Sequence, residues 1–258
     1  MLDRHIQKGL RVLVTAGAAG IGREIVRALV GDGARVHICD IDTAALEDAR
    51  REHGVTTSIT DVAEVGQVER LFVDVRETLG GLDVLVNNAG IAGPTAGVES
   101  VTPADWRRTI AVNLDGQFYC AHFAVPLLRQ STRGTIVNMS SVAGRLGYPF
   151  RTPYAASKWA VVGFTESLAR ELGPDGITVN AILPGPVEGP RIERVIRARA
   201  EQFRVPYEEM EQWYRDKSSL RRMVSSQDIA AMVVFLCSEA GRNISGQSLS
   251  VCAGVETL

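Results

Sequence analysis

Short apolar runs rich in β-branched residues alternate with longer segments of helical periodicity along the chain. The apolar runs predict strands at residues 10–15, 35–39, 55–59, 84–86, 135–139, 178–182 and 248–251. The periodic segments predict helices at residues 21–31, 43–53, 64–79, 103–130, 154–172 and 226–239. Such alternation builds right-handed crossovers and a mainly parallel sheet with helices on both faces. We therefore expect an α/β, doubly wound, Rossmann-like fold with about seven strands.

Residues at the helix ends agree with this pattern. Thr102, followed by proline and by an acid in the first turn, is typical of a capped helix start. The Gly-Pro pair at 173–174 predicts the end of the preceding helix, and Ser225 or Ser226 is expected to start the last one. No repeat or Pro/Ser-rich linker interrupts the chain, so residues 1–258 are expected to form a single domain.

Composition narrows the kinds of partner. The formal net charge of -2 offers no basic field for nucleic acid, and no apolar run approaches the roughly 20 residues that span a bilayer. No signal-peptide pattern is present, so we expect a cytoplasmic protein with a small-molecule partner and neither a membrane nor a nucleic-acid partner. The cysteines are far apart and form no CxxC pair, which predicts reduced, buried thiols and no metal site: Cys39, Cys120, Cys237 and Cys252.

A glycine-rich turn at residues 15–22 follows the first predicted strand and opens the first helix. In this context its main-chain N–H groups suit the pyrophosphate of a dinucleotide, although a tight turn without a ligand is the alternative. The expected contacts are Gly17, Gly20, Ile21 and Gly22. Asp40 ends the second strand, where a carboxylate can accept hydrogen bonds from the adenosine ribose. Asp61 and Val62, directly after the third strand, are expected near the adenine.

Tyr154 and Lys158 are four residues apart and share one face of a predicted helix. A positive charge beside a phenol stabilises the phenolate, so Tyr154 is suited to exchange a proton with a substrate alcohol. By itself this spacing is common, and a chance surface pair would explain it. Three further motifs stand at strand ends, however: Asn87-Asn88-Ala89-Gly90, Asn138 to Gly144, and Pro184-Gly185.

Together with the glycine-rich turn and Asn113, these motifs resemble, in order and over almost the whole chain, those of the short-chain dehydrogenase/reductase family. The resemblance implies that Ser141 hydrogen-bonds the substrate oxygen, Tyr154 transfers the proton, and Lys158 binds the nicotinamide ribose. Asn113 would hold a water that passes protons to Lys158. Ser140 is adjacent to Ser141 on the strand, so its side chain should point to the opposite side, and a structural role is expected. The implied cofactor contacts are Asn88, Ala89, Gly90, Tyr154, Lys158, Pro184, Gly185 and Val187.

Two positions depart from the family pattern. Ala16 stands where the family usually has glycine, so the turn must tolerate a Cβ atom. Gly189 stands where a threonine usually fixes the nicotinamide carboxamide, and main-chain groups near Val187 are expected to serve instead.

A charged segment at residues 186–222 resembles the family's variable, helical substrate lid. Within it, residues 189–222 contain nine arginines or lysines against six acids. A solvated amphipathic helix is the simpler explanation of these charges. The sharper one is an anionic substrate contacted by Arg191, Arg194 or Arg197, because the guanidinium fork pairs well with acid groups.

The resemblance implies reversible oxidation of a secondary alcohol to a ketone, with a polyol, sugar derivative or hydroxy acid as the substrate. A reductase of 3-oxoacyl thioesters on acyl carrier protein would share the motifs, and a catalytically silent dinucleotide-sensing protein is the alternative from another class. NAD is expected rather than NADP, because Asp40 would repel a 2′-phosphate and neither Ala19 nor Ile41 supplies a positive charge. The family habit implies a homotetramer.

Overall fold

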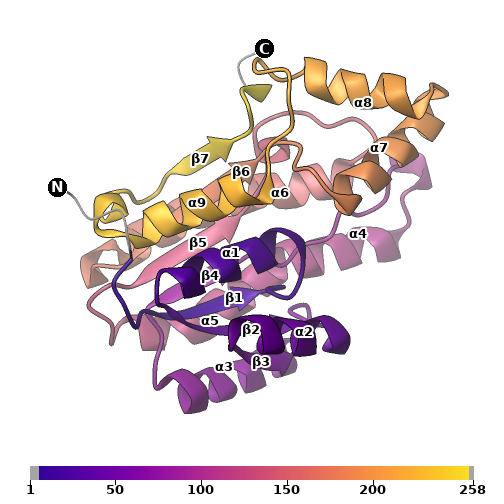
Figure 1. Cartoon of the computed structure of the whole chain (residues 1–258). Coiled ribbons are helices and arrows are strands. Elements are labelled where there is room, and N and C mark those ends of the chain that lie inside the picture. The colour runs from indigo at the N-terminus through magenta and orange to yellow at the C-terminus, as the bar shows by residue number, and fades with distance from the viewer. Residues whose placement is uncertain (1–5, 256–258) are drawn as a thin grey trace.

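Seven strands form a single sheet in the computed structural model, which describes residues 6–255 (Figure 1). They lie in the order β3-β2-β1-β4-β5-β6-β7, and each neighbouring pair is parallel. The strands are β1 (Arg11–Thr15), β2 (Arg35–Asp40), β3 (Thr56–Ile59), β4 (Val84–Asn87), β5 (Thr135–Met139), β6 (Thr178–Pro184) and β7 (Ser248–Val251). Every predicted strand is present, with ends within two residues of the prediction. The predicted doubly wound α/β fold is confirmed.

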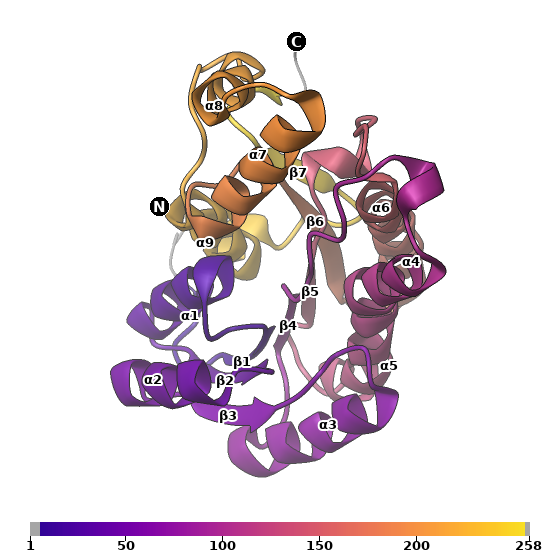
Figure 2. The same ribbon diagram turned by 90° about the vertical axis from the view of Figure 1, so that its right-hand side faces the viewer.

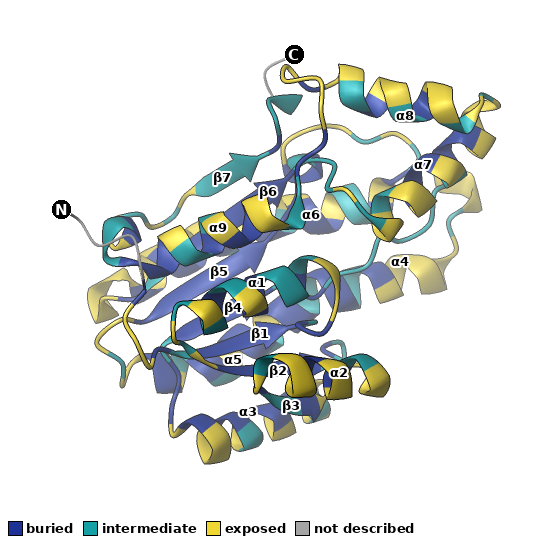
Figure 3. Cartoon of the chain, viewed as in Figure 1, coloured by how far each residue is buried: buried dark blue, intermediate teal, exposed yellow. Residues whose placement is uncertain are grey.

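Helices cover both faces of this sheet (Figure 2). The helices are α1 (Gly20–Gly31), α2 (Thr43–His53), α3 (Val65–Leu79), α4 (Pro103–Ile110), α5 (Gly116–Leu128), α6 (Thr152–Leu172), α7 (Pro190–Phe203), α8 (Tyr207–Asp216) and α9 (Ser226–Cys237). α1, α2 and α9 pack on one face, and α3, α5 and α6 on the other. In β1, Val12 and Val14 enter the first core and Leu13 enters the second, so the sheet is buried on both sides (Figure 3).

α7 and α8 form a separate layer with a small core of their own. This core joins Val195 and Ile196 of α7 to Met210 and Tyr214 of α8. The two helices stand apart from the helices that flank the sheet, as Figure 2 shows. They occupy the segment that the sequence identifies as the lid.

Helical structure runs without a break from Pro103 to Leu128, as predicted for residues 103–130, but a π-helical turn that was not predicted divides it. α4 ends before residues Ala111–Asp115, which form a π-helical turn, and α5 follows. The wider turn directs Asn113 inward, where its side chain exchanges hydrogen bonds with both main-chain groups of Ile91. One extra residue in a single turn changes the spacing of apolar residues too little for the sequence pattern to reveal it.

The predicted helix ends are confirmed. Thr102 Oγ1 accepts a hydrogen bond from the N–H of Asp105 at 3.1 Å. Ser225 and Asp228 form a reciprocal capping box at the start of α9. α6 ends directly before Gly173.

The four cysteines are free and buried, as predicted: Cys39, Cys120, Cys237 and Cys252. Within residues 6–255, no helix combines the length and the apolar character needed to cross a membrane.

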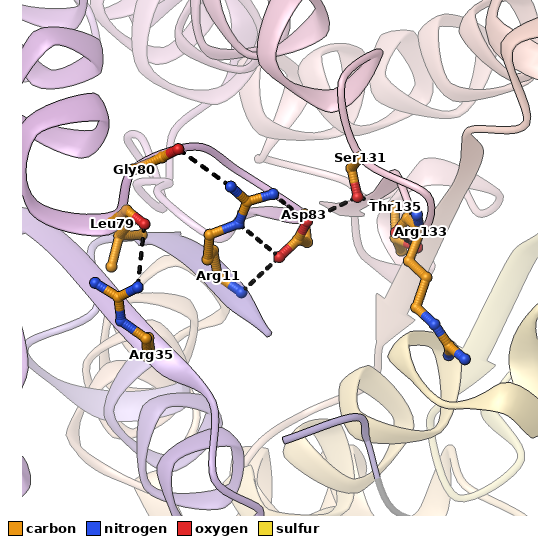
Figure 4. A network of polar contacts seen from close by, with 8 residues as sticks. All are labelled: Arg11, Arg35, Leu79, Gly80, Asp83, Ser131, Arg133 and Thr135. Atoms are coloured by element: carbon orange, nitrogen blue, oxygen red, sulfur yellow. Dashed lines mark hydrogen bonds and ion pairs between the residues drawn. The ribbon is translucent and has the colours of Figure 1, made fainter. Parts of the chain in front are cut away.

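A polar network joins the amino ends of β1 and β4 (Figure 4). Arg11 donates from Nε and Nη2 to the two carboxylate oxygens of Asp83, at 2.9 and 2.7 Å. The main-chain N–H of Arg11 and the hydroxyl of Ser131 donate to the same carboxylate. Burial alone would raise the pKa of Asp83, but the hydrogen bonds from Arg11 and Ser131 outweigh it and hold this pKa below its ordinary value.

We expect Asp83→Asn to lower the free energy of unfolding by about 2 kcal/mol near neutral pH, because Arg11 loses a charge-assisted partner. Because the pKa of Asp83 is lower in the folded state, its full contribution to stability is present at pH values above its unfolded-state pKa, near 3.9. This contribution is lost as the pH falls through the lower folded-state pKa. The difference between wild type and variant should therefore shrink in urea titrations carried out at progressively lower pH.

Asp48→Asn provides the control, because Asp48 forms an ion pair with Arg51 in which both side chains are exposed. It should cost less than about 1 kcal/mol. Equal losses in the two variants, or a loss at Asp83 that does not depend on pH, would contradict this account of the network.

Candidate active site

A cavity of about 530 Å³ lies at the carboxyl ends of the strands and is bounded on one side by α7 and α8. Ligands of doubly wound sheets bind at this edge, where the loops from the two halves diverge. The predicted site residues that line the cavity are Gly20, Ile21, Gly22, Asp40, Asn88, Gly90, Ser141, Tyr154, Lys158, Pro184, Gly185 and Val187. Segments far apart in the sequence are thus brought to one space.

The glycine-rich turn is fixed by the end of β4. Thr15 Oγ1 accepts hydrogen bonds from the N–H groups of Asn88 and Ala89. Asn88 Nδ2 donates to the carbonyl oxygens of Thr15 and Ala16, each at 3.0 Å. Ala16 has a φ of 50°, in the left-handed region where glycine is usual. The loop therefore accommodates the Cβ atom that departs from the family pattern, at some cost in backbone strain.

The start of α1 fits a pyrophosphate. Residues 19–22 line the cavity, and the N-cap residue Ala19 makes no side-chain cap hydrogen bond, so the N–H groups of the first turn remain open to an anion. Asp40 Oδ1 accepts a hydrogen bond from the N–H of Ile41 at 2.8 Å, which fixes the carboxylate in the cavity wall. Its remaining lone pairs can accept from ribose hydroxyls. These residues would hold the adenosine half of a dinucleotide.

We expect Gly22→Ala to raise the Kd for NADH at least about 100-fold, which corresponds to about 2.7 kcal/mol. A Cβ atom at Gly22 would lie 2.1 Å from the carbonyl oxygen of Ala16 and 2.7 Å from Asn88 Nδ2, so the turn must shift. Fluorescence titration with NADH measures the effect. Gly31→Ala, at the end of the same helix, adds a Cβ that meets nothing within 4 Å and should leave the Kd unchanged. Similar affinities for NADH in the two variants would show that the pyrophosphate does not bind at this turn.

Three chemically active side chains meet in the cavity: Ser141, Tyr154 and Lys158. Ser141 Oγ accepts a hydrogen bond from the N–H of Ala143 at 3.2 Å, and no group in residues 6–255 accepts its hydroxyl proton. Tyr154 and Lys158 lie on the first turns of α6, with Lys158 Nζ 5.8 Å from the centre of the Tyr154 ring. A hydroxyl, a phenol and an ammonium around one space can bind a substrate oxygen and transfer its proton.

Lys158 is almost fully buried, with 3% of its surface exposed. Its Nζ donates to the carbonyl oxygen of Met139 at 2.8 Å. Burial, assisted by the positive charge of Arg191, lowers the pKa of Lys158 to about 7. A negatively charged ligand in the cavity would therefore restore the ammonium form. Ser140 Oγ donates to the carbonyl oxygen of Lys158 at 2.8 Å, in keeping with its predicted structural role.

Asn113 lies behind these groups rather than in the cavity wall. Its Nδ2 donates to the carbonyl oxygen of Ile91 and to Ser157 Oγ, and its Oδ1 accepts from the N–H of Ile91. Asn113 Oδ1 and Lys158 Nζ both flank Gly90, where an added Cβ would lie 3.2 and 3.5 Å from them. The Asn113 side chain thus joins α6 to the segment after β4, and its water relay stays a prediction.

Several known proteins are similar to this chain in sequence and in fold. A family model described as enoyl-(acyl carrier protein) reductase matches residues 16–256. D-beta-hydroxybutyrate dehydrogenase of Cupriavidus necator is 33% identical over 92% of this chain and 94% of that protein. A short-chain dehydrogenase/reductase of Armillaria gallica is 34% identical over 99% of each. The chain belongs to the short-chain dehydrogenase/reductase family.

A solved structure extends this similarity to three dimensions. The crystal structure of NAD⁺-bound xylitol dehydrogenase is 29% identical, matches with a TM-score of 0.92, and covers 96% of this chain and 99% of that one. As a short-chain dehydrogenase/reductase, the protein is an oxidoreductase that acts on alcohol and carbonyl groups with a nicotinamide cofactor.

Some predicted residues lie outside the cavity wall of this oxidoreductase. They are Gly17, Asp61, Val62, Ala89 and Asn113. Asp61 pairs with Arg108 at 2.9 Å, and Val62 is buried against Gly116. Their proposed contacts with the adenine stay predictions.

The lid arginines divide into two groups. Arg191 and Arg194 line the cavity, whereas Arg197 is absent from its lining and lies over the ring of Tyr207, with 5.4 Å between guanidinium carbon and ring centre. Contact of Arg191 or Arg194 with substrate stays a prediction.

Two buried arginines in the cavity wall were missed by the sequence analysis. Arg199 carried a detectable signal, because Val195, Ile196 and Ala200 form an apolar stripe on α7 and an arginine falls within it. Arg151 carried none, because it stands just before α6, in a segment without periodicity.

Proposed function

We propose that this oxidoreductase reversibly oxidises a secondary alcohol to a ketone with NAD(H), and that a polyol, sugar derivative or hydroxy acid is its substrate. The observation that carries the proposal is the cavity itself. It combines Ser141, Tyr154 and Lys158 with an open helix start and with Asp40. Two similar proteins are named for hydroxybutyrate and xylitol, and each of these compounds contains a secondary alcohol group.

In this proposal each side chain acts on the substrate oxygen or on its proton. Ser141 donates its free hydroxyl proton to the oxygen and so fixes the carbinol beside Tyr154. Tyr154 Oη takes the alcohol proton during oxidation and returns it during reduction. Lys158, buried beside the phenol, stabilises the phenolate when charged. The nicotinamide, when bound, supplies or accepts the hydride.

A reductase of 3-oxoacyl thioesters is the second candidate. A protein of Streptomyces violaceoruber named as a ketoacyl reductase is 35% identical over 94% of this chain, and the same three side chains would serve the keto group of a 3-oxoacyl thioester. A silent dinucleotide-sensing protein is less well supported, because it would have no use for an assembled hydroxyl, phenol and ammonium.

A screen of secondary alcohols, ketones and 3-oxoacyl thioesters with NAD(H) and NADP(H) tests the proposal through the absorbance of the reduced nicotinamide. Turnover of alcohols with NAD supports it. Turnover of thioesters with NADPH would favour the second candidate. Tight NADH binding without any turnover would favour the sensor.

We further propose a cytoplasmic homotetramer built through α5 and α6. Phe118 on α5 and Trp159 on α6 are each about half exposed, at 50% and 51%, which leaves large aromatic surfaces to be covered by other subunits. Analytical ultracentrifugation measures the assembly, and a monomer at micromolar concentration would contradict it.

A further inference from the structure

Two arginines in the cavity wall are buried without an acidic partner. Arg151 and Arg199 are 2% and 4% exposed, and neither forms an ion pair with a carboxylate of residues 6–255. The Nε of each is buried and lacks a hydrogen-bond partner. Burying a guanidinium in this way is strongly unfavourable unless an anion compensates its charge.

Both guanidinium groups are held in place by the surrounding protein. Arg151 Nη2 donates to the carbonyl oxygen of Ala92 at 2.8 Å, and Arg199 Nη1 donates to that of Pro149 at 3.0 Å. Their guanidinium carbons lie 5.2 and 5.0 Å from the centre of the Tyr148 ring. The two cations therefore converge on one aromatic side chain while some of their N–H groups stay free.

A pair of phenols adds a neutral donor at the same place. The hydroxyls of Tyr148 and Tyr214 are hydrogen-bonded to each other, which uses only one of their two O–H protons. Burial raises the pKa of Tyr214, so this phenol stays protonated. The guanidinium carbon of Arg199 also lies 5.9 Å from the centre of the Tyr214 ring, so the two arginines pack against the phenol pair.

We infer that Arg151, Arg199 and the phenol pair form a carboxylate subsite that binds the acid group of the substrate. The guanidinium fork of arginine matches a carboxylate. The O–H proton that is not used between Tyr148 and Tyr214 can donate a further hydrogen bond to the same carboxylate. The inference rests on the proposed function, because it assigns a binding site to an acid group of the same substrate whose alcohol is oxidised beside Tyr154. Arg151 lies 4.7 Å from the centre of the Tyr154 ring, so the bound acid stays within a few atoms of the reacting carbon.

The substrate class is therefore a short hydroxy acid or oxo acid rather than a neutral polyol. A neutral polyol would leave both buried guanidinium groups without a compensating charge.

The test compares 3-hydroxybutanoate with its neutral amide, using NAD and the variants Arg151→Gln and Arg199→Gln. The wild type should prefer the acid at least about tenfold in kcat/KM. Each variant should lose about 10- to 100-fold on the acid, mainly through KM, and less than about threefold on the amide. Arg204→Gln, at the C-cap of the same helix and outside the cavity lining, is the control and should change neither value.

The wild-type comparison decides the matter even if a variant does not fold. Turnover of neutral alcohols without preference for the acid would overturn the subsite and leave the proposed function standing. Equal losses of kcat/KM on the acid and the amide in both variants would show that the two arginines are structural and do not bind the acid group. If the wild type turns over neither of these compounds nor any alcohol or ketone of the wider screen, the proposed function fails, and calorimetric titration of the NADH complex with 3-hydroxybutanoate then decides. Binding that is lost in Arg151→Gln supports the subsite, and no binding to the wild type overturns it.

Discussion

Replacement of Tyr154 by phenylalanine is expected to reduce kcat about 10²- to 10⁴-fold, the usual contribution of a general acid/base group. The substitution removes only the phenolic oxygen of a residue that lines the cavity together with Ser141 and Lys158. The ring and its contact with Arg151 remain, so folding and NADH binding should hardly change. Stopped-flow absorbance gives kcat, and fluorescence titration gives the Kd for NADH.

Tyr119→Phe is the matched control, because Tyr119 lies on α5 outside the cavity lining. Its kcat should stay within about twofold of wild type, as is usual away from reacting groups. If Tyr154→Phe kept most of its kcat, another group would have to transfer the proton. If it lost NADH binding as well, Tyr154 would be a cofactor-positioning residue first.

The fold could be predicted because every central strand is buried on both faces. Short apolar runs such as Val12-Leu13-Val14 in β1 and Val84-Leu85-Val86 in β4 mark these strands in the sequence. The cavity followed from topology, since motifs at the ends of parallel strands must meet at one edge of the sheet. Ser141, Tyr154 and Asp40 line the cavity at that edge.

Other parts of the site depended on contacts that no local pattern encodes. The π-helical turn around Asn113 is set by hydrogen bonds to Ile91, which is 22 residues away. Arg151 could not be recognised as buried, because the carbonyl oxygen of Ala92 that it contacts, and Arg199, which packs on the same Tyr148 ring, come from distant segments of the chain. Asp61 follows β3 as expected, but its ion pair with Arg108 of α4 could not be foreseen.

The choice between NAD and NADP should depend on the charge at the end of β2. Asp40 lines the cavity, with Oδ1 fixed by the N–H groups of Ile41 and Asp42 and Oδ2 3.4 Å from the nitrogen of Ala18. A 2′-phosphate would bring negative charge against this carboxylate. Arg35, on the same strand, cannot offset it, because its guanidinium donates to main-chain carbonyls at the C-terminal end of α3.

We expect the wild type to favour NAD over NADP about 10- to 1000-fold in kcat/KM, and Asp40→Ala to remove most of that preference. Like charges about 4 Å apart repel by about 1 kcal/mol in water and about 4 kcal/mol at an effective dielectric of 20, and lost ribose hydrogen bonds add to this. Asp42→Asn removes the same charge two residues away, at the N-cap of α2, where asparagine can still cap the helix. Its cofactor ratio should stay near that of the wild type. A wild type that favours NADP, or an Asp40→Ala variant whose ratio matches that of Asp42→Asn, would show that another residue sets the choice.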